Sequence, residues 1–161
     1  MQQPNAFTSL RIVHIALLSG MTAFAIVAMT LVNTGFAAVV DDSTQRILQV
    51  VCILLSVLAL FAGFKFFKKR ILAARNHMEA GEKRMEMYRT ACILWWAMIE
   101  GPGIVAGVAF VLSGNYAFFA LAVFHILALL TFAPRKANII LFLNLSKEEV
   151  VRLEGGKYTK K

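Results

Sequence analysis

Four apolar stretches alternate with polar connections along the chain, over residues 12–32, 47–64, 90–112 and 116–133. A helix needs about 20 mainly apolar residues to cross the hydrocarbon core of a bilayer. The pattern therefore predicts an all-α membrane protein with four transmembrane helices, arranged as two helical hairpins in a single membrane domain over residues 1–161.

Two polar segments indicate further helical structure. Residues 65–89 hold eight Lys/Arg and three Glu, with no proline and one glycine, so we expect the flanking helices of this hairpin to continue beyond the bilayer. In the tail, residues 134–161, Ser146 and Glu149 have the spacing of a capping box, which predicts a short helix that Gly155 ends.

The charge distribution predicts the orientation. The chain is 59% hydrophobic and 16% charged, with a net charge of +8. The loop 65–89 holds eight basic residues and the tail seven, whereas the two opposite connections together hold one, Arg46. Basic residues favour the cytoplasmic side, so we expect a multi-pass protein of the bacterial inner membrane with both termini cytoplasmic. The lipid bilayer accounts for the basic charge, and we expect no nucleic-acid partner.

The first span and the two halves of the chain each leave two interpretations open. Gly35-Phe36-Ala37 offers a signal-peptide cleavage site, although the 21-residue apolar run exceeds the usual core of about 7–15 residues and favours a retained helix. Arg11 and Thr22 align with Arg89 and Glu100 at an offset of 78 residues. The alignment reflects either chance similarity of apolar sequences or an internal duplication, a parallel repeat of two hairpins.

Glu100 is the only Asp, Glu, Lys or Arg within the four spans. It lies eleven residues after Arg89, about 16 Å along a helix and hence near mid-membrane. A carboxylate at that depth is unfavourable unless it is neutral or paired. We therefore expect a buried, mostly protonated Glu100 that binds a proton or an ion. A neutral acid that only fixes helix packing is the alternative.

Several residues are predicted to surround Glu100. Gly103 and Gly107 share its helix face as a GxxxG pair, so this face is expected to pack against another helix. Trp96 lies one turn earlier on that face, and Pro102 deprives a carbonyl of its helical hydrogen bond. His125 lies at nearly the depth of Glu100 and would lower the free-energy cost of both groups by pairing with it. The alternative for His125 is a hydrogen bond to a backbone carbonyl or a serine.

Two further polar residues of the spans, Thr22 and Ser56, carry hydroxyl groups. Thr22 and Ser56 can donate hydrogen bonds into the bundle, which makes them further candidates for proton or ion binding. The chain shows no nucleophile–base pair, phosphate-binding glycine loop or zinc-ligand spacing. The sequence therefore predicts neither an enzyme nor a metal site nor a bound cofactor.

The region around Glu100 resembles a known family. Ala97, Met98, Ile99, Glu100, Ile104, Phe110 and Leu112 match the carboxylate-bearing helix of the membrane c subunit (proteolipid) of rotary F- and V-type ATPases. In that family a helical hairpin with a cytoplasmic loop carries a mid-membrane Glu or Asp that binds a proton or sodium. Residues 47–112 have the same order of helix, loop and carboxylate-bearing helix as that hairpin. They differ from it because the helix 47–64 has bulky side chains where the family has many glycines, and because the loop 65–89 is longer than the family's loop. The whole chain also resembles small four-helix bacterial membrane proteins, and this second resemblance does not indicate any particular activity.

Three functional classes are consistent with these patterns. In the first, Glu100 serves a proton- or ion-linked membrane protein, as the resemblance implies. In the second, the chain is a non-catalytic accessory or scaffold subunit of a membrane complex, either a homo-oligomer or an assembly with other chains. The third, a small exporter, ranks lowest because such exporters carry their buried Glu in the first span.

Overall fold

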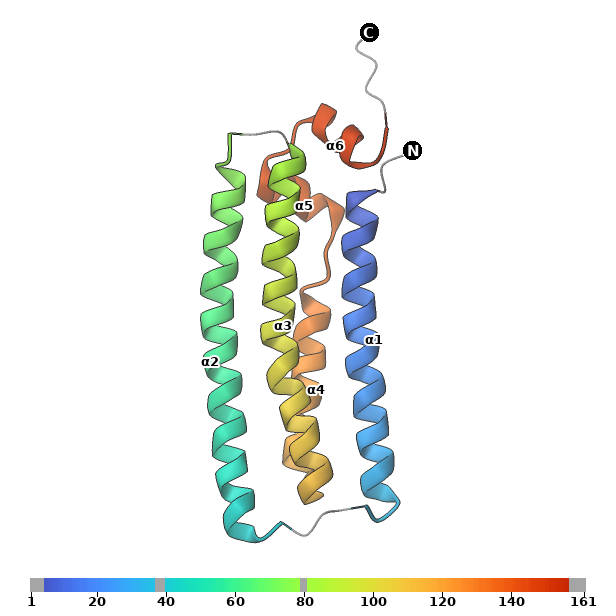
Figure 1. The fold of residues 1–161 in the computed structure, drawn as a ribbon, viewed down its shortest axis with the longest axis vertical. Helices are drawn as coiled ribbons and strands as arrows, with labels where there is room; N and C mark the ends of the chain where they lie inside the picture. The colour runs from blue at the N-terminus through green and yellow to red at the C-terminus, as the bar shows by residue number, and fades with distance from the viewer. Residues whose placement is uncertain (1–4, 37–39, 79–80, 157–161) are drawn as a thin grey trace.

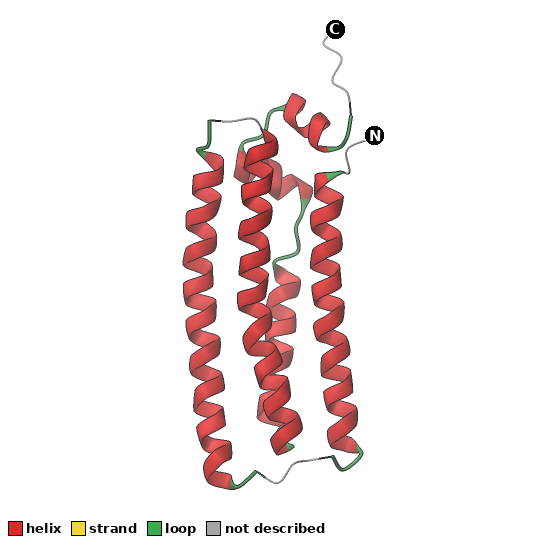
Figure 2. Cartoon of the chain, in the orientation of Figure 1, coloured by secondary structure: helices red, strands yellow, loops and turns green. Residues whose placement is uncertain are grey.

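A computed structural model describes residues 5–36, 40–78 and 81–156, which form six helices and, within those ranges, no strand (Figure 2). The helices are α1 (Ala6–Asn33), α2 (Asp42–Arg75), α3 (Gly81–Ser113), α4 (Tyr116–Thr131), α5 (Lys136–Leu143) and α6 (Lys147–Leu153). Helices α1 to α4 run alternately up and down in a bundle, and α5 and α6 lie at the end where α1 and α3 begin (Figure 1). The prediction of an all-α bundle is confirmed.

The helix ends follow from local chemistry. The side chains of Asn5, Asp41 and Asn115 each accept a hydrogen bond from a backbone N–H in the first turn of the helix that follows. Gly114 has a φ of +66°, a left-handed conformation that glycine adopts without strain, and it lets the chain reverse between α3 and α4. Asparagine, aspartate and glycine at these positions therefore determine where the helices begin and where the chain reverses.

The structure confirms that both polar segments contain helix, whereas their position outside a bilayer stays a prediction. Helix α2 continues to Arg75 and α3 begins at Gly81, so both extend well into the charged loop 65–89. In the tail, the Ser146 side chain accepts from the Glu149 N–H, and the Glu149 carboxylate accepts from the Ser146 N–H at 2.8 Å. Gly155 follows α6 with a φ of +81°. The predicted capping box and short helix are confirmed.

Helix α3 is the centre of the fold. It packs against α1, α2, α4, α5 and α6, whereas α1 and α2 have little direct contact with each other. Its buried positions recur every three or four residues and form one continuous face, on which the neighbouring helices pack. Helix α1 has a different set of neighbours from α3, although a duplication would make the two equivalent. The internal duplication stays a prediction.

The outer surface of the bundle is apolar. Side chains such as Ile26, Leu58 and Phe61 are more than 60% exposed. Three helices, α1, α2 and α3, are long and apolar enough to cross a membrane, and a fourth span exists only if α4 and α5 are taken together across their 69° bend. Helix α4 has 16 residues and ends at Thr131, shortly before Pro134, which disfavours helix at the residue before it.

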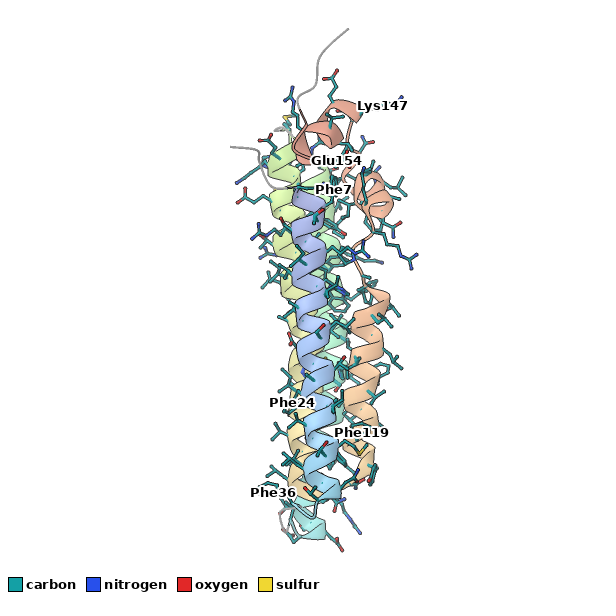
Figure 3. All side chains as sticks on the ribbon, turned by 90° about the vertical axis from the view of Figure 1, so that its right-hand side faces the viewer. Phe7, Phe24, Phe36, Phe119, Lys147 and Glu154 are labelled. Atoms are coloured by element: carbon teal, nitrogen blue, oxygen red, sulfur yellow. The ribbon has the colours of Figure 1, made fainter. Side chains whose placement is uncertain are left out.

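Residues 135–156, which we call the end cap, fold over the starts of α1 and α3. Arg84 of α3 donates to the Leu143 carbonyl at 2.9 Å and forms an ion pair with Glu149. Lys136 forms an ion pair with Glu154. Figure 3 shows Lys147 and Glu154 near Phe7, at the end of the bundle opposite Phe36. Helix α5, which the sequence analysis did not predict, contributes the buried Ile139 and Leu143 to this contact.

The ion pair of the end cap depends on the charge of Glu149. Partial burial raises the pKa of its carboxyl group, but the hydrogen bonds from Ser146 and Arg84 outweigh this effect and lower the pKa below the usual 4.5. Because the folded-state pKa is lowered, ionised Glu149 stabilises the docked cap above pH 4.5. This contribution is lost as the pH falls through the lowered pKa.

Close helix packing at Gly103 gives a first prediction. A Cβ atom there would lie 2.0 Å from Met21 Cε of α1 and 2.8 Å from His125 Cβ of α4, whereas a Cβ at Gly101 would meet nothing within 4 Å. Gly103→Ala is expected to destabilise the protein by about 1–3 kcal/mol through overpacking. The matched change Gly101→Ala should leave stability unchanged or raise it by up to about 1 kcal/mol. Thermal unfolding in mild detergent compares them, and equal stability of the two variants would contradict the packing.

Candidate functional site

Glu100 lies in the middle of α3, at the boundary between its packed and its outer surface. The preceding Ile99 is fully buried, whereas Glu100 is half-buried and Ala97 and Gly101 beside it are exposed. The carboxyl group has no hydrogen bond or ion pair with any residue in the described ranges. The structure therefore shows a half-buried, unpaired acid rather than the fully buried one that we expected, because Ile99 takes the inward position of that helical turn.

The expected pair between Glu100 and His125 does not form. His125 is fully buried, and its Nε2 lies 3.0 Å from Ser56 Oγ on α2. Ser56 Oγ in turn donates to the Cys52 carbonyl at 2.8 Å, so its single proton is used and His125 Nε2–H is the donor to it. The imidazole is thus held by a serine, the alternative left open by the sequence. The two groups diverge because His125 extends toward α2, whereas Glu100 lies on the α1 side of α3.

Gly107 shows which helix lies on the Glu100 side. It is one of the residues predicted for helix packing, and a Cβ there would lie 2.5 Å from Phe24 Cε1 of α1. Figure 3 shows Phe24 on α1, in the half of the bundle nearer Phe36. The other residues in that group, Trp96, Pro102 and Gly103, are likewise buried on α3. The GxxxG pair therefore contacts α1, and Glu100 flanks this contact.

Thr22 lies apart from the other candidates. It is exposed on α1, and its hydroxyl donates to the Leu18 carbonyl of its own helix at 2.8 Å. That bond is the local one that threonine commonly makes within a helix. Thr22 therefore contributes no hydrogen bond to Glu100, His125 or Ser56 among the described residues.

The sequence analysis gave no role to His14, which the structure places inside the bundle. His14 is buried, its Nε2 lies 3.0 Å from the Leu129 carbonyl of α4, and its ring contacts Trp96 edge-on at 4.8 Å between centroids. The signal was present, because His14 belongs to the same buried stripe of α1 as Leu10 and Met21. A polar residue on a packed stripe requires a partner inside the bundle.

The polar contacts together tie α4 to each of its neighbours. His14 links it to α1, His125 links it to α2, and the Trp96 N–H reaches the Phe132 carbonyl at 3.4 Å from α3. Within the described residues no group of three His, Cys, Asp or Glu side chains could hold a metal ion. These contacts hold the bundle together, and they leave Glu100 as an acid without a partner on its flank.

The hydrogen bond between Ser56 and His125 gives a second prediction. Ser56→Ala removes the acceptor of a fully buried imidazole N–H and is expected to destabilise the protein by about 1–3 kcal/mol. Thr22→Ala removes an exposed hydroxyl with a local bond and should change stability by less than about 0.5 kcal/mol. Unfolding midpoints in the same detergent measure both changes. A Ser56→Ala variant as stable as Thr22→Ala would show that His125 has another partner.

Comparison of this chain with models of protein families, with curated proteins and with solved structures gives no match. The resemblance of residues 47–112 to the c subunit therefore stays a prediction from the residues alone. Functional inference for this protein rests on the chemistry of its own side chains, above all Glu100.

Proposed function

We propose that the protein is an integral membrane protein that acts as a non-catalytic accessory subunit of a membrane complex, and that Glu100 contacts a further transmembrane helix. In this proposal α1 to α4 lie in the bilayer, and both termini and the end cap lie in the cytoplasm. The apolar outer surface of the bundle supports the membrane location. The basic residues of α2 and α3 beyond the apolar stretches, and those of the end cap, gather at one end, which supports the orientation.

The unpaired carboxyl group of Glu100 is the observation that carries this proposal. In the apolar environment around mid-helix, an acid without a partner is unfavourable. The bundle provides a partner for Nε2 of each buried histidine, Ser56 and the Leu129 carbonyl, but it offers Glu100 no donor in the described residues. A donor on a neighbouring helix, from a second copy of the chain or from another protein, would remove this cost.

The surface beside Glu100 suits such a helix. Ala97 and Gly101 are exposed one turn apart on α3, and a Cβ at Gly101 would meet nothing within 4 Å. Small residues four positions apart let two transmembrane helices approach closely, and polar side chains beside them form hydrogen bonds across the contact. Close approach at Ala97 and Gly101 would bring the partner helix within reach of the Glu100 carboxyl group.

A proton- or ion-linked role is the second candidate, and the half-exposure of Glu100 favours it. A carboxyl group at the flank of α3, without a counter-charge in the described residues, can exchange a proton from the side of the bundle. A proton- or ion-linked role requires a carboxyl group that can ionise. The accessory role needs only a hydrogen-bonding side chain of that shape.

Substitutions at Glu100 test the proposal and separate the two roles. Wild type is expected to run in mild detergent as a complex heavier than the 17.8 kDa chain, as measured by native mass spectrometry. Glu100→Leu should release the monomer because the hydrogen bond is lost, whereas Glu100→Gln should retain the complex because an amide can replace the protonated acid. The control Ile104→Leu changes an exposed neighbour on α3 and should assemble normally.

Other outcomes would overturn the accessory role. A monomeric wild type, or a Glu100→Leu variant that assembles as well as wild type, would contradict it. Ion flux through proteoliposomes that Glu100→Gln abolishes without loss of assembly would favour the second candidate instead.

A further inference from the structure

A cavity of 610 Å³ lies between α2 and α5, over α3 and beside the point where α4 ends. Its size falls within the range of roughly 300–1,000 Å³ that is typical of ligand pockets. Most of its wall is apolar and comes from three parts of the chain: Phe64, Phe67 and Ile71 of α2, Trp95 of α3, and Phe132 and Phe142 on either side of the bend. An apolar ligand segment would fit this wall.

Three basic side chains also line the cavity, and among the described residues no acidic side chain does. They are Lys68 and Arg75 of α2 and Arg135, which precedes α5. The ion pairs formed among the described residues use other cations, Lys83, Arg84 and Lys136. Lys68 Nζ lies 4.8 Å above the ring of Phe64, so positive charge directly adjoins the apolar wall. An apolar wall beside three such cations is complementary to an anionic amphiphile.

One residue of the cavity wall, Trp95, has a buried donor that is unpaired among the described residues. Trp95 lines the cavity and is 3% exposed, and its Nε1 has no hydrogen-bond partner in the described part of the chain. By contrast, Nε1 of the neighbouring Trp96 bonds the Phe132 carbonyl. Buried donors are nearly always paired. The unpaired N–H of Trp95 is therefore an exception among the tryptophans of this wall.

The position of the cavity along the bundle matches the boundary between acyl chains and headgroups. On α2 the apolar residues give way to Lys65, Lys68, Lys69 and Arg70 at this level. Helix α5 bends 69° away from α4, follows the basic Arg135 and exposes Leu141 and Phe142. Such a helix, with basic and apolar side chains together, is suited to lie in the plane of the membrane interface.

We propose that this cavity binds one acidic phospholipid of the surrounding bilayer. An acyl chain packs against Phe67 and Trp95, and the phosphate is held by Lys68, Arg75 and Arg135. The proposal rests on the proposed membrane location but not on the accessory role of Glu100. In this proposal the lipid is a bound component of the protein, located where the bundle meets the end cap.

Lipid binding by the purified full chain in mild detergent tests this site. Native mass spectrometry counts phosphatidylglycerol and phosphatidylcholine with the same acyl chains, added at equal concentration. Wild type should retain one phosphatidylglycerol at least about tenfold more strongly than phosphatidylcholine. The triple variant Lys68→Gln, Arg75→Gln, Arg135→Gln should lose this preference. The matched variant Lys65→Gln, Lys69→Gln, Arg70→Gln removes three charges that do not line the cavity and should keep it.

A second measurement locates the acyl chain. Phosphatidylglycerol with brominated chains should quench the fluorescence of wild type more than that of Trp95→Phe, because bromine quenches an indole in contact with it. Equal retention of the two lipids by wild type would overturn the proposal. Equal loss of the phosphatidylglycerol preference in the two triple variants would also overturn it, because it would indicate diffuse electrostatic attraction. Displacement of the lipid by inorganic phosphate would overturn it as well, because it would indicate a site for a free anion. Resistance of the same protein to carbonate extraction from membranes is scored separately, so a failure of membrane insertion is distinguished from an empty cavity.

Discussion

The close approach of α1 and α4 to α3 at Gly103 is the contact on which the rest of the structure depends. Without a side chain at this position, Met21 and His125 reach the backbone of α3 from two sides. His125 is thereby held where its ring meets Ser56 of α2, so one glycine places three helices around the fourth. Because α3 also extends past the bundle to Gly81, the same helix provides Arg84 to the end cap.

This arrangement separates satisfied from unsatisfied groups. Nε2 of both buried histidines and the Trp96 N–H form hydrogen bonds within the bundle. The Glu100 carboxyl group, the Trp95 N–H, His125 Nδ1 and Arg84 Nε have no partner in the described residues. Glu100 lies on the flank of α3 and the Trp95 ring lines the cavity beside α5, so another molecule could cover each of these two places. The proposed contacts, a further helix and an acidic lipid, follow from the chemistry of these two sites.

The sequence was sufficient for features that depend on local chemistry. The presence of α1 to α4 follows from the four apolar runs, and the extension of α2 and α3 into residues 65–89 follows from the absence of proline there. The capping box at Ser146 and the turn at Gly114 follow from residues a few positions apart. It was insufficient where rotation about a helix decides the result. Glu100 and Ile99 differ by one position, yet only Ile99 faces the core, and His125 could be assigned a depth but not the helix it faces. The sequence did not predict helix α5 because its eight residues are too few to show a clear helical pattern of apolar and polar positions. Its position depends instead on the tertiary contacts of Ile139 and Leu143.

Accessibility of single cysteines on the two ends of the bundle tests the membrane location most directly. The native Cys52 and Cys92 are both buried, so cysteine substituted at exposed Phe36 or Met78 reports its own end. In intact spheroplasts, a membrane-impermeant maleimide should label Phe36→Cys, and it should label Met78→Cys only after the membrane is opened. Labelling of Met78→Cys in intact spheroplasts, or equal labelling of both positions, would contradict a bundle that spans the membrane with its end cap in the cytoplasm.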